Sequence, residues 1–453
     1  MSGLSAIPDG SKRKATFRSR ELLSGCRRPA RDREFAFLRG TLRGRSEPRA
    51  RALVGDDPLT SQITGTISVH PGAGRVPRLQ PPREGAPLKV TGQTVPFSCW
   101  PTVRQTRRAK LQPRVFTSDP WALIAEGIAD MCPKKSREAA LAFRAQAEDF
   151  YDAAMTMGNR NIGAKPLLLY YSFLNLGKAY LLTRGNLTPQ GRPGHGVSER
   201  ARVRQVEGVR LTVYPSTPGK PQLFAEFMRT LTGQALSSSR YFRLGNLMPQ
   251  ILFGHRVWCS AARERERFLS LRDVQYVDDR ANHHAWIRLR FEKQELSKLR
   301  ISQENTLKGT RLGSRWHFVN QPDNGFCECH CIEQVGSTPY SHRPSDALAR
   351  ITSEVRPYLW SSVLLHPPYR RYYLYVAPPS ERASVLPQLL SMYLVMFFLG
   401  SVTRYQPHQF DRLLETRYGA HLIGAVTEIP AQYLYLMASE LLQREVTRAS
   451  LAY

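Results

Sequence analysis

Five polar side chains of this sequence could together hold an anion such as phosphate. They are one amide and four basic groups: Asn175, Lys178, Arg184, His195 and Arg404. Guanidinium and ammonium groups attract phosphate by charge, and an amide or imidazole N–H adds a hydrogen bond. His195 stands between two glycines, which would let a ligand approach the backbone closely. These residue types predict an anion-binding pocket.

The same residues also have interpretations without a ligand. Ser172, Asn175 and Lys178 recur every three residues, so they would share one side of a helix and could form a satisfied internal network. Arg404 would end an apolar helix, where a cation meets the free carbonyl groups and the helix dipole. His195 could be an ordinary turn histidine. For the helical strip we favour the internal network over a catalytic set.

A metal or cofactor site is not indicated. Cys327, Cys329 and Cys331 alternate and would lie on one face of a strand. Structural zinc sites space paired Cys by about two to four residues, so we interpret the run as buried small side chains. There is no GxxxxGK, HExxH or GxSxG motif. We therefore expect no metal and no cofactor, and we expect reduced thiols in a cytoplasmic protein.

Strong patterns predict the helices that must position these side chains. Asp119 followed by Pro120 predicts a helix from about residue 118 to Met131. Apolar residues at helical spacing predict a second helix over 136–157, and the apolar stretch 167–185 predicts a third, buried helix. Short loops join the three, which is typical of an antiparallel bundle. Later helices are predicted over 344–360, 386–402, 408–416 and 430–447.

The middle of the chain mixes strand and helix patterns. Helices are predicted over 223–236 and 245–253, and the alternating charges of 263–267 predict a solvated helix face. The apolar run 386–402 approaches the length of a membrane span, but Gln388 and Ser391 interrupt it, so we expect a buried helix and no membrane. We expect one antiparallel sheet made of the strands 206–214, 284–291, 314–319, 326–334 and 371–376.

Positive charge is concentrated in the first part of the chain. The 453 residues include 65 Lys and Arg against 37 Asp and Glu, and the net charge of +28 favours polyanionic partners. Residues 1–113 hold 22 of the basic and 8 of the acidic residues, with weak periodicity. This composition predicts a disordered basic leader. It could be a start-site artefact, since the next Met after Met1 is Met131, an idle tail, or an arm that grips phosphates.

Four blocks of the sequence resemble the YaaC-like family of bacterial proteins. The resemblance spans residues from about 115 to 450 and implies no particular activity. The blocks are PLLLYYSFLNLGKAYLLTRG from Pro166 with GHGVS from Gly194, FRLGNLMPQIL from Phe242, YYLYVAPP from Tyr372, and LPQLLSMYLVMFFLGSVTRYQP from Leu386.

The first block is also similar, more distantly, to the helix of HEPN domains. That likeness is carried by Tyr170, Tyr171, Phe173, Lys178, Gly185 and His195. It implies a helical bundle and suggests RNA cleavage without a metal, in which a His moves the proton and an Arg stabilises the charged phosphate. HEPN ribonucleases place four to six residues between that Arg and His on one helix. Arg404 and His408 have three between them, so the catalytic candidates stay open as Arg404, His195 and His408.

These observations predict an α+β fold that is mainly α, with a HEPN-like helical bundle and C-terminal helices flanking a small antiparallel sheet. The expected domains are the leader 1–113, the bundle 114–200, a mixed α/β region 201–380 and a C-terminal helical region 381–453 that packs on the bundle. The leading hypothesis is a cytoplasmic YaaC-like protein that binds RNA or another polyanion without catalysis. The alternatives are a metal-independent HEPN-like RNA endonuclease of a toxin or defence system, and a structural homodimer. Whether the protein is an enzyme is left open.

Overall fold

Helices dominate the described chain and several small sheets accompany them, so the predicted α+β, mainly α, fold class is confirmed. The computed structural model describes residues 83–101, 113–158, 162–200, 205–310, 312–319, 328–342, 344–364 and 370–448. The predictions for residues 1–82 and 102–112, including the start-site artefact, fall outside the described residues.

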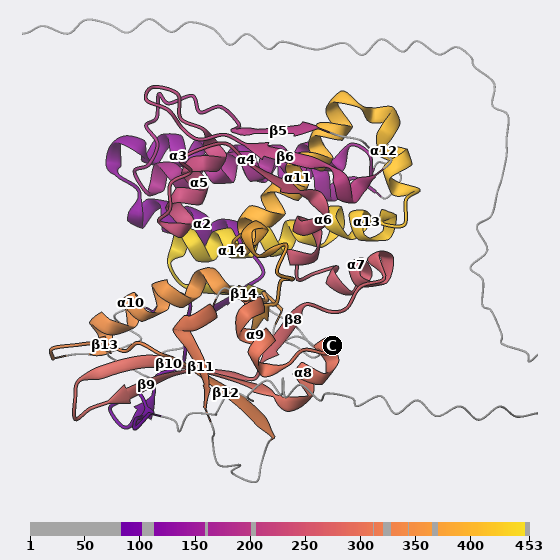
Figure 1. The fold of residues 1–453 in the computed structure, drawn as a ribbon. Helices are drawn as coiled ribbons and strands as arrows, with labels where there is room; N and C mark the ends of the chain where they lie inside the picture. The colour runs from indigo at the N-terminus through magenta and orange to yellow at the C-terminus, as the bar shows by residue number, and fades with distance from the viewer. Residues whose placement is uncertain are drawn as a thin grey trace, which may run out of the picture. The chain divides into compact units, whose positions relative to one another are not determined.

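The three predicted bundle helices are present as α2 (Pro120–Met131), α3 (Lys134–Thr156) and α4 (Lys165–Thr183). Asp119 caps α2, because its carboxylate accepts a hydrogen bond from the Ala122 N–H at 3.1 Å. α4 is apolar nearly all round because it is enclosed by α3, α11 (Gln388–Tyr405) and α14 (Ile429–Leu442). Figure 1 shows these helices together, away from the strands β9 to β12.

The C-terminal helices complete this core. α11 is followed by α12 (Pro407–Leu414), α13 (Gly419–Thr427) and α14. Within the described residues, no helix is both long and apolar enough to cross a membrane. The helix predicted over 430–447 is wrong at its end, because Gln443 adopts φ 53° and stops α14. Residues of the predicted last turn instead form β16 (Glu445–Arg448), which pairs in parallel with β4 (Arg114–Thr117).

The predicted strands belong to separate sheets, so the expectation of one sheet is wrong. The largest sheet runs in the order β1 (Ala86–Pro87), β9 (Asp273–Asp279), β10 (His284–Glu292), β12 (Cys329–Gln334) and β11 (Trp316–Val319), with β13 (Thr338–Pro339) also on β10. A second contains β14 (Leu359–Ser361), β15 (Tyr372–Tyr375) and β8 (Phe268–Leu271). A third contains β5 (Val197–Arg200), β6 (Arg210–Val213) and β7 (Arg240–Arg243). The alternation of apolar and polar residues predicts which face of a strand is buried. It does not predict the neighbour with which that strand pairs.

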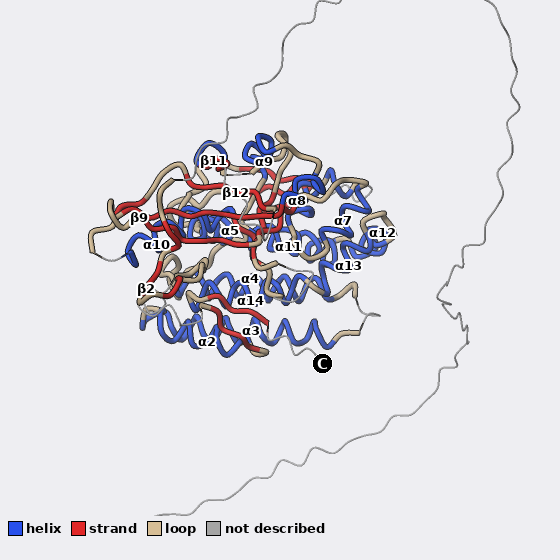
Figure 2. The backbone as a smooth tube through the Cα atoms, turned by 90° about the horizontal axis from the view of Figure 1, so that it is seen from below, coloured by secondary structure: helices blue, strands red, loops and turns tan. Residues whose placement is uncertain are grey.

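The shorter helices cover these sheets and connect them to the bundle. They are α5 (Leu223–Thr232), α6 (Leu244–Leu247), α7 (His255–Ala262), α8 (Lys293–Leu299), α9 (Gln303–Gly309) and α10 (Pro344–Val355). The predicted helix 344–360 ends early, and its last residues form β14. The predicted helix 245–253 is α6 with a single 3-10 turn. Figure 2 shows α8 and α9 beside β11 and β12, far from α2 and α3.

The charged run 263–267 is not a solvated helix face, as its alternating charges had predicted. Arg263 takes φ 57° directly after α7 and ends the helix. The side chain of Arg267 is buried and forms ion pairs with Glu264 at 2.5 Å and Glu381 at 2.6 Å. The run is therefore a loop that directs one arginine inward.

Residues 83–101 are part of the fold, so the predicted leader is wrong for this segment. β1 extends the largest sheet, and β2 (Lys89–Val90) pairs with β3 (Gln93–Thr94). Leu88, Phe97 and Trp100 are buried in the core beneath that sheet. The Phe97 ring lies 5.2 Å from the ring of Tyr276. Burial of these side chains stabilises the sheet at its edge.

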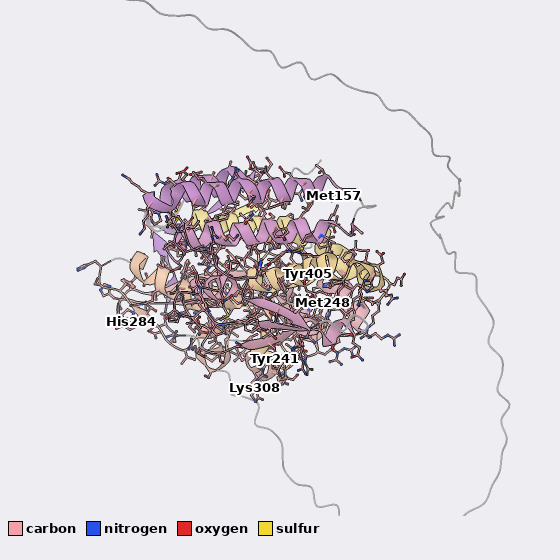
Figure 3. The ribbon with its side chains drawn as sticks, turned by 90° about the horizontal axis from the view of Figure 1, so that it is seen from above. Met157, Tyr241, Met248, His284, Lys308 and Tyr405 are labelled. Atoms are coloured by element: carbon pink, nitrogen blue, oxygen red, sulfur yellow. The ribbon has the colours of Figure 1, made fainter. Side chains whose placement is uncertain are left out.

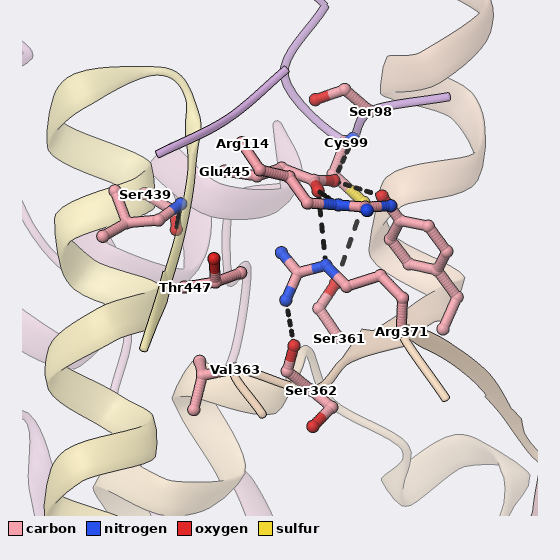
Figure 4. A network of polar contacts seen from close by, with 12 residues as sticks. Ser98, Cys99, Arg114, Ser361, Ser362, Val363, Arg371, Ser439, Glu445 and Thr447 are labelled. Carbon is pink, nitrogen blue, oxygen red and sulfur yellow. Dashed lines mark hydrogen bonds and ion pairs between the residues drawn. The ribbon is translucent and has the colours of Figure 1, made fainter. Parts of the chain in front are cut away.

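A buried carboxylate, Glu445, ties four segments together (Figure 4). Its side chain is 0% exposed. It accepts hydrogen bonds from the Cys99 N–H at 2.9 Å and from the Tyr372 hydroxyl. Arg371 and Arg114 place their Nε atoms 3.2 Å and 3.4 Å from it. A buried charge needs such partners, because burying it alone is costly.

The cysteines of the described residues do not all match the prediction of reduced thiols. Cys99, Cys132, Cys259 and Cys331 are buried free thiols. Cys329, at the start of β12, is disulfide-bonded, so the prediction is wrong for that residue. Cys327 lies outside the described residues.

Candidate functional site

A pocket of about 410 Å³ lies where α4, α11 and the edge strand β5 meet. α4 and α11 approach closely at Gly400, where an added Cβ would lie 2.9 Å from the Tyr170 Cβ and 3.2 Å from the Pro166 carbonyl oxygen. The close approach places residues of both helices around one space. We call it the His195–Arg404 pocket; its lining is Leu167, Tyr170, His195, Val197, Ser198, Glu199, Phe397, Gly400, Ser401, Arg404 and Tyr405.

His195 is held at the pocket by a loop fixed to the start of α5. The Gly194 carbonyl accepts a hydrogen bond from the Leu223 N–H at 2.8 Å, and Gly196 takes φ 74°. The His195 Nδ1 lies 2.6 Å from the Tyr170 hydroxyl. Burial lowers the pKa of His195, and the charges of Lys178 and Arg404 lower it further. The imidazole is therefore neutral at neutral pH, with one nitrogen engaged by the tyrosine.

Arg404 supplies positive charge at the mouth of this pocket. Its Nη1 donates a hydrogen bond to the Tyr171 hydroxyl at 2.7 Å, and its guanidinium lies 5.1 Å from the centroid of the Tyr405 ring. No described carboxylate forms an ion pair with it. Tyr405 is 67% exposed, a large fraction for an aromatic side chain. The exposed end of α11 thus presents a cation without a described ion-pair partner beside an exposed aromatic ring.

Glu199 is the acidic member of the pocket. Burial raises the pKa of Glu199, and a hydrogen bond with the Ser401 hydroxyl lowers it in part. Its Oε2 is buried and has no hydrogen-bond partner among the described residues. Burial also raises the pKa of Tyr170. The Tyr170 hydroxyl therefore keeps its proton and can donate to a ligand oxygen, while Glu199 is a weaker acid than an exposed glutamate.

Asn175 and Lys178 point instead toward α3. Asn175 Nδ2 donates to Gln146 Oε1 at 2.8 Å, and Lys178 Nζ lies 3.5 Å from Asn175 Oδ1 and 4.8 Å from the Phe143 ring centroid. Ser172 Oγ donates to the Ala147 carbonyl at 2.8 Å. The strip is a partnered internal network, as we favoured. Burial within it lowers the pKa of Lys178.

The other two candidates lie elsewhere. Arg184, at the far end of α4, donates to the Glu440 carbonyl at 2.7 Å. His408 is exposed on α12 and does not line the pocket. Of the candidate residues, the structure brings together His195 and Arg404. It adds Glu199 and Tyr405, which the sequence patterns did not single out, and Tyr170, which had carried the likeness to HEPN domains but was not a site candidate.

The pocket can bind an anion and could also move a proton. Arg404 offers charge, the Tyr170 hydroxyl offers an O–H group, and neutral His195 offers either a donor or an acceptor. No cluster of three or more His, Cys, Asp or Glu side chains that could hold a metal is found in the described parts of the chain.

The fold and this pocket define a mainly helical α+β protein with a cationic, aromatic-rimmed pocket at a helix–strand junction. The chain belongs to the YaaC-like family, because the family model described as YaaC-like Protein matches residues 103–441. No curated protein and no solved structure is similar enough to match the chain. Cys99 and Glu445, which join in the buried network, lie just outside the two ends of the family match. The likeness to HEPN domains has no support from these comparisons and stays a prediction.

Proposed function

We propose that this YaaC-like protein binds RNA, or another phosphate-bearing polyanion, in the His195–Arg404 pocket. The observation that carries the proposal is the unneutralised Arg404 beside the exposed Tyr405 ring. A guanidinium can hold two phosphate oxygens at once, and an exposed aromatic ring can stack on a base.

The test is binding of a fluorescent single-stranded RNA of about 20 nucleotides to the full chain, followed by anisotropy in EDTA. Arg404→Ala should weaken binding about tenfold or more, since hydrogen bonds to charged groups contribute about 1.5–3 kcal/mol. The matched control is Arg412→Ala, because Arg412 is exposed on the next helix and lies outside the pocket. Equal losses in the two variants would contradict binding in the pocket.

A second candidate is metal-independent RNA cleavage, the activity that the HEPN likeness suggests. It is favoured by the presence of His195, a neutral base, and Glu199, a carboxyl with raised pKa, in one pocket with Arg404. The 2′-oxygen would attack phosphorus as the base takes its proton. The bond from phosphorus to the 5′-oxygen would break as the acid protonates that oxygen, leaving a cyclic phosphate.

Cleavage is tested by incubating mixed RNA with the full chain in EDTA, beside DNA of the same sequences, which lacks the attacking hydroxyl. Products that vanish with His195→Ala and Glu199→Gln but persist with His408→Ala support the enzyme. RNA binding without cleavage supports the binder. The homodimer, the domain division and the cytoplasmic location stay predictions of the sequence.

A further inference from the structure

The outer face of the third sheet has an unusual composition for an exposed surface. On β6, Leu211 and Val213 are buried against the bundle, so the alternate residues of the sheet face outward. Register places Glu199 opposite Leu211, on the inner face. The outward residues of the three strands are Ser198, Arg200, Arg210, Thr212, Tyr241 and Arg243.

Three arginines form a row across this face. Arg200 pairs with Arg210, and Arg210 pairs with Arg243, in adjacent strands. Directly opposed side chains have Cβ atoms about 5 Å apart, and like charges there are destabilising. None of the three forms an ion pair with a described carboxylate. Without a ligand, the protein carries this repulsion between the three arginines. A bound polyanion would relieve it.

Two tyrosines accompany this arginine row. Tyr241 is 58% exposed and Tyr214, which follows β6, is 41% exposed. The Arg210 guanidinium lies 5.3 Å from the centroid of the Tyr241 ring, and the Tyr214 hydroxyl lies 2.8 Å from Ser198 Oγ. The face therefore combines cations with aromatic rings that present free surface. Figure 3 labels Tyr241 and, at the end of α11, Tyr405 of the pocket.

The neighbouring carboxylates do not neutralise the row. Glu199 points to the inner face of the sheet, into the pocket. Glu207, just before β6, accepts hydrogen bonds from Arg417 and, at 2.7 Å, from the Tyr418 hydroxyl. Those contacts lower the pKa of Glu207 and hold its charge away from the sheet. The positive charge of the face is a consequence of strand register and of these partners.

We propose that the outer face of β5, β6 and β7 binds single-stranded RNA, with phosphates on the arginine row and bases stacked on the tyrosines. Strands lie about 4.8 Å apart, so the row is a line about 10 Å long that a flexible backbone can follow. Only unpaired bases expose a face to stack on Tyr241, which is why a single strand fits better than a duplex. Arg404 is not part of this surface, so the proposal does not rest on the pocket.

The test compares two triple variants of the full chain. The first carries Arg200→Gln, Arg210→Gln and Arg243→Gln. The matched control carries Arg272→Gln, Arg300→Gln and Arg412→Gln, three exposed arginines that form no ion pair with a described carboxylate and lie outside the third sheet. Both lose the same charge. Anisotropy with labelled oligouridine of about 20 nucleotides is measured from about 50 to 300 mM KCl.

The row variant should bind at least about tenfold more weakly, and its slope of log affinity against log salt should fall by about 2, because three phosphate contacts are lost. The slope of the control variant should differ from that of the parent by no more than about 0.7, the change expected for one lost phosphate contact. Tyr241→Ala should weaken binding about fivefold or more without changing the slope. Thermal midpoints equal to or above that of the parent show that the variants fold, since the changes remove like-charge repulsion.

Equal losses in the two triple variants overturn the proposal. So does equal affinity for duplex RNA or a polyglutamate peptide, which would make the face a general polyanion or protein surface. An unchanged affinity in Tyr241→Ala also overturns it, because it would show that no base stacks on this ring. Arg404→Ala, measured in parallel, separates the two sites. If this variant binds RNA as tightly as the parent, the proposal for the pocket is wrong and the proposal for the sheet surface is unaffected.

Discussion

Replacing Tyr433 by Phe should stabilise the protein, although Tyr433 lies at the centre of the helical core. Its side chain is 0% exposed, and its ring stacks on Phe173 with centroids 3.6 Å apart. The described residues offer no hydrogen-bond partner to its hydroxyl. A buried polar group without a partner costs about 1–3 kcal/mol. Tyr433→Phe keeps the stacked ring and removes only that group, so the free energy of unfolding should rise by about 1 kcal/mol or more.

Tyr372→Phe is the matched control, because the same atom is removed from a partnered site. The Tyr372 hydroxyl donates to the buried carboxylate of Glu445. Hydrogen bonds to charged groups contribute about 1.5–3 kcal/mol, so this variant should lose stability by that amount. The two substitutions are chemically identical and should change stability in opposite directions.

Urea unfolding of the full chain, followed by tryptophan fluorescence and far-ultraviolet circular dichroism, measures both changes. We expect the Tyr433→Phe midpoint above that of the parent and the Tyr372→Phe midpoint below it, with similar slopes. A Tyr433→Phe midpoint below the parent would refute the assignment of an unpaired hydroxyl. Shifts in the same direction would show that ring packing, and not hydrogen bonding, dominates both sites.

Three further predictions follow from particular contacts. Gly400→Ala should lower the free energy of unfolding by about 1–3 kcal/mol, because it forces α11 away from α4, and it should weaken RNA binding in the pocket. Thermal melts measure the first effect. The control is Gly424→Ala, which should be stabilising in the same melts because the space around Gly424 is open. Glu445→Ala should destabilise by about 3–5 kcal/mol in urea titrations, because its buried arginine partner is left unpaired. Burial holds the pKa of His255 at about 3 and of His421 at about 4. The unfolded chain takes up these protons below pH about 6.5, so stability should fall with acidification, by about 2 kcal/mol per histidine between pH 6.5 and 5, and the matching Gln variants should flatten that dependence.

The helices could be predicted because their signals are local. α2 begins where Asp119 can accept a hydrogen bond from the third residue of its own helix, a contact that two neighbouring residue types determine. α4 and α11 are apolar on every side, and such helices must be buried wherever they lie. The ends of the helices were harder to predict. Gln443 stops α14 with a positive φ, a conformation that glutamine does not favour.

The site was predicted in part. His195 stood out because glycines flank it, and Arg404 because it ends the most apolar helix. Glu199 carried no signal, since an acid in an edge strand is ordinary until the fold buries it against α11. Lys178 was a misleading candidate for the anion site. A lysine in an apolar helix can face either a ligand or, as here, a neighbouring helix.

Local residue patterns were enough to predict the mainly helical class of this YaaC-like protein, the positions of its buried helices and two residues of its pocket. Which strands pair became visible only in the folded protein, and this pairing places the arginine row, turns Glu199 inward and brings Glu445 to its partners. The reason is the range of the interactions. Helix hydrogen bonds and caps join residues a few positions apart, so residue types specify them directly. Strand register joins residues that are distant in the chain, and many pairings satisfy the same alternation until the core is complete.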